Sequence, residues 1–289
     1  MKIVDIVGGL GNQMFSYAFA IALQNRFPHE QVKIDVSSYS SYALHNGLEI
    51  ERIFDVKLQK ATKEEISKLS YYSKYYKIGR IKKRILPRKD GTCYEFPLEK
   101  QDRKALYTEG DKYYEGYWQD YRYFHYYYRQ ICDVFQFKIE LPPEVEHVRQ
   151  QILNSNSVCV HIRRGDYLKD KMYQGCCDLD YYQRAIKYIR DTEKKPHFFI
   201  FSNDIHWCIE HIVPLLGDCY TIVDCNRGTE SYRDLQLMSC GKLMIIANSS
   251  FSWWAAYLNK TTNLKVIAPI LWSNNMRSYD RQLPEWLRM

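Results

Sequence analysis

The alternation of strand-like and helix-like segments after residue 150 is the feature that most restricts how this chain can fold. Short apolar runs typical of buried strands alternate there with longer segments whose apolar residues recur at helical spacing. Such alternation predicts a parallel sheet covered by helices on both faces. The predicted strands are residues 157–162, 197–202, 220–224, 243–248 and 264–268, and the predicted helices are residues 180–191, 206–216, 230–240 and 250–259.

The chain opens with the same kind of unit. Residues 2–7 predict a strand, residues 8–13 form a glycine-rich turn, and residues 14–27 predict a helix. A glycine turn in this position lets the backbone approach a ligand and directs helix N–H groups at an anion. It is not the dinucleotide-binding fingerprint, because Met14 stands where a third glycine would follow Gly9 and Gly11. Glycines that serve only the geometry of the turn are the alternative.

The rest of the first half predicts fewer features. We expect a strand at residues 32–36, a helix within residues 64–83, a strand and turn at residues 113–118, and an aromatic-rich helix at residues 119–135. Tyr117 and Trp118 could stack on a sugar ring, although most aromatic side chains here are expected in the core. The prolines at 142 and 143 interrupt the pattern, so we place a domain boundary there and divide the chain into residues 1–145 and 146–289.

The charge balance indicates which kinds of ligand the chain can bind. The chain has 41 basic and 34 acidic residues, a net charge of +7. This mild excess suits an anionic ligand or a membrane surface, but it lacks the clustering expected of a nucleic-acid-binding protein. Residues 77–89 are the richest in Lys and Arg. They indicate either a solvated helix face or a surface that docks on anionic lipid.

Cysteine usage and the N-terminus predict the location. Nine cysteines without a CxxC pair favour a reducing cytoplasm. A strand beginning at Lys2 leaves no room for a signal peptide, and no apolar run approaches the roughly 20 residues of a membrane span. We therefore expect a cytoplasmic protein whose contact with the inner face of the membrane is at most peripheral.

Polar residues follow four of the predicted strands in the second half. The first strand leads into His161, Arg163, Arg164 and Asp166, and Gly165 allows the chain to turn. Ligands of open α/β sheets bind outside the carboxyl ends of the strands, and two arginines there can clamp phosphate oxygens. One arginine paired with Asp166 and the other solvated is the alternative. The other strand ends carry Ser202, Asn203, Asp204, Asp224, Asn248, Ser249 and Ser250.

Two further features concern a nucleotide diphosphate. A helix opening at Ser250 offers hydroxyl and N–H groups and a positive dipole end, which with Arg163 could hold a diphosphate without metal. Asp234 could accept hydrogen bonds from a guanine edge, or it is an ordinary polar helix residue. Asp178 and Asp180 match the DxD pattern of metal-dependent sugar transferases, but aspartate at a helix start is also a common cap.

Three segments resemble the bacterial GDP-fucose-dependent α-1,2-fucosyltransferase family, glycosyltransferase family 11. They are residues 8–15, residues 161–166, and residues 234–239 together with 247–254. Residues 116–119 and 201–204 also resemble family positions. The resemblance implies an α/β protein of the GT-B type, with two Rossmann-like domains and a cleft between them. It implies that residues 1–145 face the acceptor and that residues 146–289 bind GDP-fucose.

The resemblance also implies roles for single residues. Arg163 would bind the β-phosphate and stabilise the leaving group, His161 and Asp234 would hold guanine, and Ser249, Ser250 and Phe251 would lie at the phosphates. The turn with Gly9 and Gly11 would close over the donor, with Asn12 near the reacting sugar. Asp166 is a candidate general base by position alone.

The implied reaction is the transfer of L-fucose from GDP-β-L-fucose to the 2-hydroxyl of a terminal β-galactoside, with inversion and without metal or cofactor. The acceptor would be an oligosaccharide or a lipid-linked glycan, and no nucleic acid would bind. A transferase for another GDP-sugar, an NAD enzyme and a non-catalytic glycan-binding protein are the alternatives. The missing third glycine and the HIRRGD segment argue against NAD.

Overall fold

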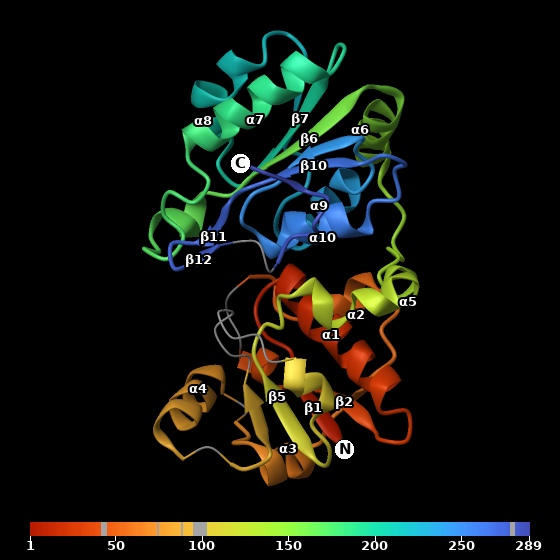
Figure 1. Cartoon of the computed structure of the whole chain (residues 1–289), viewed down its shortest axis with the longest axis vertical. Helices are drawn as coiled ribbons and strands as arrows, with labels where there is room; N and C mark the ends of the chain where they lie inside the picture. Colours follow the sequence, from red (N-terminus) through yellow and green to blue (C-terminus); the bar gives the residue numbers. More distant parts are fainter. Residues whose placement is uncertain (42–44, 74, 88, 95–102, 278–280) are drawn as a thin grey trace. The chain divides into compact units, whose positions relative to one another are not determined.

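A computed structural model describes residues 1–41, 45–73, 75–87, 89–94, 103–277 and 281–289, with the backbone alone at residues 76, 94, 103, 104, 166 and 276. The chain forms two compact units, Met1–Lys138 and Ile139–Met289. Each unit has its own parallel sheet with helices packed on it (Figure 1). The division falls seven residues before the boundary that the sequence predicts.

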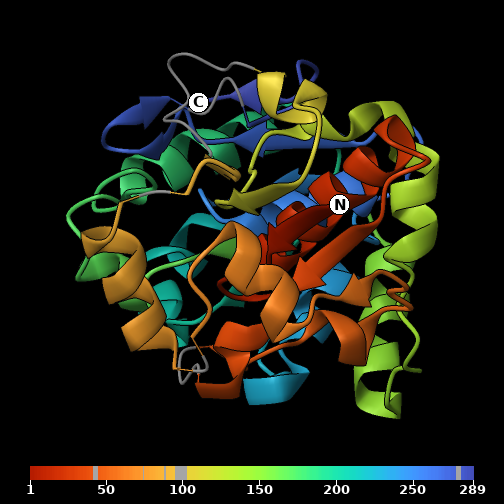
Figure 2. The same cartoon turned by 90° about the horizontal axis from the view of Figure 1, so that it is seen from below.

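Unit 1 contains a five-stranded parallel sheet in the order β3-β2-β1-β5-β4. Figure 2 gives a second view of its strands and helices. Its strands are β1 (Lys2–Asp5), β2 (Val32–Asp35), β3 (Gln59–Lys60), β4 (Thr92–Tyr94) and β5 (Lys112–Glu115), and its helices are α1 (Leu10–Arg26), α2 (Ile50–Ile53), α3 (Lys63–Leu69), α4 (Tyr76–Ile85) and α5 (Tyr128–Val134).

Helix α1 is the central helix of unit 1. It is buried all round from Leu10 to Leu23, apart from Asn12, so its sequence is apolar on every face instead of amphipathic. It begins four residues earlier than predicted because Gly9 takes the N-cap position. Gly11 was expected in the loop before α1, but it lies in the first turn of the helix.

Two predictions for unit 1 need correction. Residues 119–135 do not form one aromatic-rich helix: two 3₁₀ turns (Tyr121–Tyr123 and His125–Tyr127) precede α5. The chain is diverted because Trp118 adopts a positive φ of 53° and stacks on Phe19, with ring centres 4.1 Å apart. Residues 64–83 form two helices instead of one, because α3 ends at Leu69 and Ser70 adopts an extended conformation.

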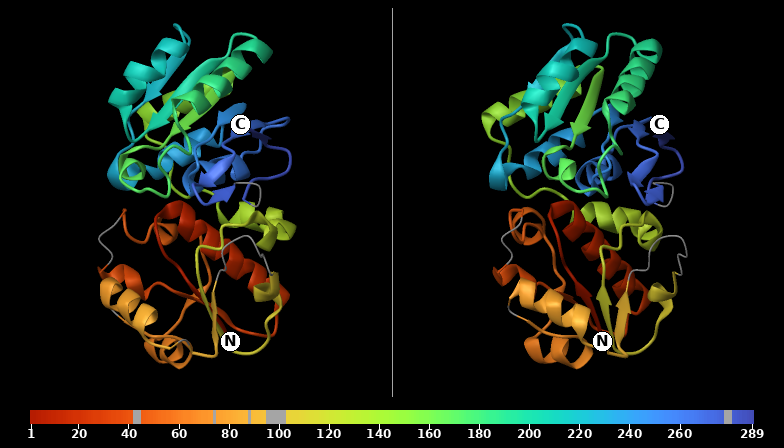
Figure 3. Two further views of the ribbon diagram at one scale, coloured as in Figure 1. Left: turned by 60° about the vertical axis from the view of Figure 1, so that its left-hand side comes forward. Right: turned by 90° about the vertical axis from the view of Figure 1, so that its left-hand side faces the viewer.

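Unit 2 contains a six-stranded parallel sheet in the order β13-β10-β9-β6-β7-β8 (Figure 3). Its strands are β6 (Ser157–Ile162), β7 (His197–Ser202), β8 (Tyr220–Val223), β9 (Leu243–Ile245), β10 (Lys265–Ala268) and β13 (Leu287–Arg288), and β11 (Leu271–Ser273) and β12 (Met276–Arg277) form a separate antiparallel ribbon. Its helices are α6 (Pro143–Asn154), α7 (Leu179–Thr192), α8 (Ile205–His211), α9 (Tyr232–Met238) and α10 (Ser250–Leu258).

The predicted alternation of strands and helices in this unit is confirmed element by element. The helix predicted at residues 206–216 ends early, at His211, and a 3₁₀ turn that contains Pro214 (Val213–Leu215) follows α8. Helix α6 was missed because the proline pair was interpreted only as a break. Pro143 instead occupies the start of the helix, where its fixed φ and missing N–H cost little.

Alternation along β6 sends successive side chains to different helical layers. Val158, Val160 and Ile162 join a core cluster built with residues of α7 and α8. His161 points to the opposite face and contacts α10. The carboxyl end of β6 therefore sits between two layers with different partners, as expected for a strand in the middle of a covered sheet.

Candidate functional site

His161 is the last-but-one residue of β6 and is only 7% exposed. Its Nδ1 atom lies 2.8 Å from Ser252 Oγ, and its ring lies against Phe251 with centres 5.8 Å apart. The Tyr182 hydroxyl donates to the His161 carbonyl from the other layer, at 3.1 Å. The end of β6 is thus fixed to the first turn of α10, and the structure brings His161 and Phe251 together.

The imidazole of His161 is uncharged. Burial, and secondarily the positive charge of Arg163, lower the pKa of His161 to about 3. One ring nitrogen is engaged by Ser252, and Nε2 makes no hydrogen bond within the part of the chain that the structure describes. His161 can therefore offer a neutral hydrogen-bonding nitrogen to a ligand at any physiological pH.

The start of α10 forms a second element of the site. Ser249 is the N-cap, and its Oγ accepts from the Phe251 N–H at 3.3 Å. Before it, Asn248 donates through Nδ2 to the Trp272 carbonyl at 3.0 Å, and its N–H donates to Cys177 Sγ at 3.3 Å. The first helical N–H groups and the helix dipole favour an anion at this end, next to Ser250.

The two adjacent arginines after β6 have different surroundings. Arg164 pairs through Nε with Asp204 at 3.1 Å, and its guanidinium carbon lies 4.0 Å from the centre of the Trp207 ring. Its N–H donates to Asn203 Oδ1 at 2.9 Å. Arg164 is therefore held by α8 and the end of β7. The alternative had paired one of the arginines with Asp166; the partner of Arg164 in the structure is Asp204 instead.

Arg163 lines a pocket of about 280 Å³ in unit 2, and its guanidinium carbon lies 5.6 Å from the centre of the Tyr167 ring. The pocket lies beyond the ends of β6 and β7, and Asn248, Asp178 and Trp207 also line it. Arg164 lines it as well, whereas the other residues predicted to bind the nucleotide in this unit do not: His161, Asp234, Ser249, Ser250 and Phe251. The backbone of Asp166 belongs to a 3₁₀ turn (Gly165–Leu168), and its side chain lies outside the described part of the structure.

Asp234 lies in the first turn of α9, which packs against α10. Asn226 Nδ2 donates to Asp234 Oδ1 at 2.8 Å. Burial raises the pKa of Asp234 to about 7 despite this hydrogen bond, and the charge of Asp224 adds to the rise. Asp234 is thus a carboxyl group poised between its two protonation states near neutral pH, on the layer that also holds Ser249 and Phe251.

The glycine turn of unit 1 is fixed by side chains. Gly8 adopts a φ of +80°, and its carbonyl accepts from the buried Gln13 side chain at 3.0 Å and from the Tyr39 hydroxyl at 2.6 Å. Gln119 Nε2 donates to Asn12 Oδ1 at 2.6 Å. Two segments that resemble the same family, residues 8–15 and 116–119, are therefore in contact, and Asn12 is held in one orientation. A Cβ at Gly9 would lie 3.2 Å from the His45 ring.

A second pocket, of about 260 Å³, lies in unit 1 and was not predicted. Asp5, Asp35 and Glu115 are the last residues of β1, β2 and β5, and all three line it. Lys83 enters from α4 and lies 2.7 Å from Asp5 Oδ2 and 3.5 Å from Glu115 Oε2. Burial raises the pKa of Asp5 to about 6 against the effect of Lys83. The sequence holds a signal for this pocket, because each of the three acids ends a strand, as the polar residues do in unit 2.

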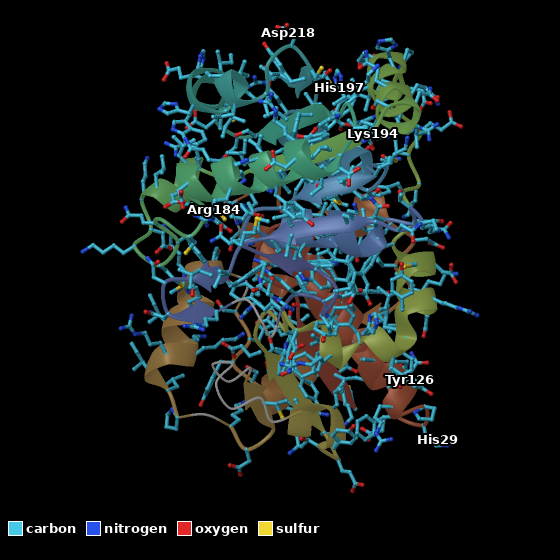
Figure 4. All side chains as sticks on the ribbon, turned by 45° about the horizontal axis from the view of Figure 1, so that its top comes forward. His29, Tyr126, Arg184, Lys194, His197 and Asp218 are labelled. Carbon is cyan, nitrogen blue, oxygen red and sulfur yellow. The ribbon has the colours of Figure 1, made fainter. Side chains whose placement is uncertain are left out.

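Two sequence interpretations are resolved by local contacts. Asp178 caps α7 by accepting from the Tyr181 N–H at 2.9 Å, and Asp180 pairs with Arg184, which is labelled on α7 in Figure 4. Both DxD acids therefore have helix-terminal roles. Within the described residues, no group of three or more His, Cys, Asp and Glu side chains is arranged to hold a metal ion.

Trp118 is fully buried and stacks on Phe19, so the expectation that it contacts a sugar is wrong. Tyr117 is exposed and lines the acidic pocket of unit 1. Tyr126 is also strongly exposed, on the surface of the aromatic-rich segment (Figure 4). All nine cysteines are free.

The family model for glycosyl transferase family 11 matches residues 1–289. This chain belongs to that family. It is 30% identical to an alpha-1,2-colitosyltransferase of Escherichia coli over 298 residues, covering 99% of this chain and 98% of the relative. It is 36% identical over 104 residues to galactoside alpha-(1,2)-fucosyltransferase 1 of Rattus norvegicus, covering 35% of this chain and 27% of that protein.

The fold also matches a solved structure. NodZ alpha-1,6-fucosyltransferase, in a crystal soaked with GDP-fucose, aligns with a TM-score of 0.54 at 15% sequence identity, covering 89% of this chain and 91% of that chain. The predicted α/β fold class of the GT-B type, with two Rossmann-like units, is confirmed. The chain is a family 11 glycosyltransferase.

Proposed function

We propose that this enzyme transfers L-fucose from GDP-β-L-fucose to the 2-hydroxyl of a terminal β-galactoside, producing an α-1,2 linkage with inversion. Family membership over the whole chain supports the class of reaction. The observation that carries the donor assignment is the end of β6, where Arg163 follows the neutral His161, whose ring contacts the first turn of α10. These groups suit a nucleotide diphosphate because they combine a fixed cation, a neutral hydrogen-bonding ring and a helix N-terminus.

In this proposal unit 2 binds the donor. His161 and Asp234 hold guanine, and Ser249, Ser250 and Phe251 lie at the phosphates. Arg163 binds the β-phosphate through its planar guanidinium, which can donate two parallel hydrogen bonds to phosphate oxygens. The ionised form of Asp234 is the one that accepts from the guanine ring N–H and amino group, so donor binding favours loss of its proton.

Arg163 contributes most in the transition state. The bond between fucose C1 and the diphosphate oxygen breaks while the acceptor oxygen bonds to C1 from the opposite face, and the sugar becomes oxocarbenium-like. Negative charge grows on the departing GDP, and a preorganised cation there stabilises the transition state more than the ground state. The acceptor hydroxyl releases its proton as the new bond forms. Asp166 is the positional candidate to receive it.

Unit 1 binds the acceptor in this proposal. The pocket with Asp5, Asp35 and Glu115 offers carboxylate oxygens that can accept from sugar hydroxyls, and the exposed Tyr117 can cover the apolar face of a galactose ring. Gly9, at the N-cap of α1, and Gly11, in its first turn, are proposed to contact the donor, and Gln119 holds the Asn12 amide for the reacting sugar. Asn12 is thus assigned to the catalytic site and Gln119 to its positioning.

The test is product analysis with the full chain. Incubation with GDP-fucose and a panel of oligosaccharide and lipid-linked β-galactosides should give an α-1,2-fucosylated product, identified by NMR, in the presence of a chelator. Glu115→Gln should raise the acceptor KM without changing GDP affinity. Loss of turnover with chelator would contradict the metal-independent mechanism, and transfer to another hydroxyl would contradict the proposed linkage.

A second donor is favoured by one observation, the full-length similarity to a colitosyltransferase. Colitose differs from L-fucose by the absence of the 3-hydroxyl group. A site that hydrogen-bonds this hydroxyl rejects the deoxy sugar by about 10⁴–10⁵ in kcat/KM, whereas an apolar site discriminates by only about 10². Comparing kcat/KM for GDP-fucose and GDP-colitose distinguishes the two enzymes. A higher kcat/KM for GDP-colitose than for GDP-fucose would make colitose, and not fucose, the sugar that the enzyme transfers.

A further inference from the structure

Helix α4 exposes an apolar stripe on the surface of unit 1. Ile78, Ile81 and Ile85 follow the spacing i, i+3, i+7, which places them on one face of the helix. Their exposed fractions are 46%, 55% and 72%. Tyr75 and Leu86, also exposed, extend the stripe at its two ends. Single exposed apolar residues are common on soluble proteins, but a continuous row on one helix marks an interaction surface.

The opposite face holds α4 to the unit. Lys83 reaches inward to Asp5 Oδ2 at 2.7 Å and to the Tyr113 hydroxyl at 3.3 Å. A Cβ at Gly79 would lie 3.3 Å from Ser73 Cβ, so Gly79 allows a close approach on the same side. The helix also packs against the 3₁₀ turn Ser37–Ser41. Because α4 is anchored by this face, the three isoleucines are directed away from the unit, and α4 lies at its rim in Figures 2 and 3.

The stripe has basic neighbours on both sides. The segment YKIGRIKKRI contains five basic residues and no acid. Helical geometry puts Lys77 and Arg84 on one flank of the isoleucines and Lys82 on the other. All three are exposed, and none has an acidic partner within the described part of the chain. An apolar stripe with a basic border has the chemistry of helices that lie in the interface of a lipid bilayer.

We propose that this α4 surface, formed by Ile78, Ile81, Ile85, Lys77, Lys82 and Arg84, docks on an anionic lipid bilayer. The isoleucines enter the boundary between headgroups and acyl chains, and the basic side chains bind lipid phosphates. Charge decides the occupant: a second copy of this chain would bring two basic helices together, whereas an anionic membrane is complementary. In the described residues, no helix has the length and apolar character to cross a bilayer, so the contact is at the surface.

Docking has a consequence for the acidic pocket of unit 1. Helix α4 supplies Lys83 to this pocket, so the docked helix would hold the pocket close to the bilayer, where a lipid-linked acceptor is located. This consequence depends on the proposed function. The docking itself does not, because it is measured without substrates.

The test is flotation of the full-length protein with vesicles of phosphatidylcholine containing phosphatidylglycerol, and with vesicles of phosphatidylcholine alone. The protein should bind the anionic vesicles at low salt and dissociate at high salt. Ile81→Ser/Ile85→Ser should weaken binding by roughly 10²-fold, because the apolar side chains of two isoleucines are no longer transferred from water into the bilayer. Lys82→Gln/Arg84→Gln should weaken it by roughly 10-fold or more.

Matched controls lie elsewhere on the surface. Ile209→Ser removes an exposed isoleucine of α8, and Lys194→Gln/Lys260→Gln removes two exposed lysines of unit 2. These variants should bind vesicles like the unchanged protein, and all variants should retain the melting temperature and GDP affinity. Three outcomes overturn the proposal: equal binding to neutral vesicles, equal losses in the control variants, or a dimer that only the α4 isoleucine variant dissociates.

Discussion

Arg163 and Arg164 are neighbours in sequence, but their contacts point in different directions. Side chains alternate between the faces of a strand, and the contacts after β6 continue this alternation. His161 contacts α10, while Arg164 contacts Asp204 and Trp207 beside α8. Arg164 therefore stabilises the end of the sheet, and Arg163, which lines the same pocket as Arg164, is the arginine that we propose to bind the ligand.

Replacing Arg163 tests this distinction. Arg163→Ala should lower kcat by roughly 10²–10³, the cost of losing one preorganised donor at a developing charge. Arg163→Lys should recover little, because lysine lacks the planar fork of donors. Steady-state kinetics with GDP-fucose and a galactoside measure both effects.

The control for Arg163 is Arg184→Ala, which removes an arginine paired with Asp180 on the outer face of α7. Its kcat should stay within about twofold of the unchanged enzyme, because surface ion pairs contribute little. Normal turnover by Arg163→Ala would remove Arg163 from the proposed role. A melting temperature measured for each variant separates loss of catalysis from loss of folding.

Asp234 should give the enzyme a pH-dependent stability. Its pKa is about 7 in the folded state and near 3.8 when unperturbed. Between pH 3.8 and about 7, the folded protein therefore keeps a proton on Asp234 that the unfolded protein has lost. The stabilising contribution of the protonated group is complete below pH 3.8 and is lost as the pH rises through about 7. Asp234→Asn, which cannot ionise, should gain stability relative to the unchanged protein on going from pH 5 to pH 8, by on the order of 2 kcal/mol.

Denaturant unfolding of both proteins at the two pH values measures this difference, and Asp218→Asn, at an exposed position of unit 2, is the control. In the same samples, GDP affinity should rise with pH through neutrality in the unchanged protein and be low and flat in Asp234→Asn. A parallel pH profile of GDP affinity in both proteins would show that Asp234 does not contact guanine.

At the residue scale, sequence reasoning worked where the signal was local. The start of a helix at Ser250 was predicted because helix starts depend on a few neighbouring residues, and the structure confirms it. The Arg164–Asp204 pair was not predicted, because it depends on the register of β6 against β7. The acidic pocket was missed for the same reason: Asp5, Asp35 and Glu115 meet only after three strands are aligned.

At the element scale, the start of α1 depends on a glycine that no other residue can replace without strain. Gly8 has a φ of +80°, and a Cβ there would lie 2.7 Å from the Asn12 amide nitrogen. Gly8→Ala should therefore destabilise the protein by roughly 1–2 kcal/mol and displace Asn12. Gly110→Ala is the matched control, since its φ is +76° but open space surrounds the added methyl.

Thermal unfolding and kcat for these two variants separate backbone strain from contact with Asn12. Both variants should be less stable, because alanine is strained in the left-handed conformation of these glycines. Gly8→Ala alone should lose activity. Equal activity in the two variants would mean that the position of Asn12 does not matter for catalysis.

The helices show which patterns in the sequence are informative. Helix α7 was predicted closely because its apolar residues have helical spacing and pack on the core cluster with α8. Residues 119–135 were predicted wrongly because aromatic content alone does not define a helix. Asp120 accepts from the Arg122 N–H at 2.9 Å and starts a 3₁₀ turn instead.

At the scale of the whole molecule, the class of fold followed from the alternation of elements, but the order of strands did not. β9 returns to pair with β6, about 80 residues earlier in the chain, and β13 adds to the edge beyond β10. Local patterns do not encode such distant pairings, because each strand has several chemically equivalent partners. The right-handed crossover rule narrows the choice without fixing the order.

The last prediction uses the division into two units. If unit 2 binds the donor, GDP at about 100 times its Kd should raise the free energy of opening of that unit by about 2.7 kcal/mol. Native-state hydrogen exchange measures this free energy of opening at amides of β6 and β7 in unit 2 and at amides of β1 and β2 in unit 1. Because each unit has its own sheet, we expect added protection in β6 and β7 and little in β1 and β2. Equal protection in both sheets would mean that the units open together, and protection confined to unit 1 would place the nucleotide in the other sheet.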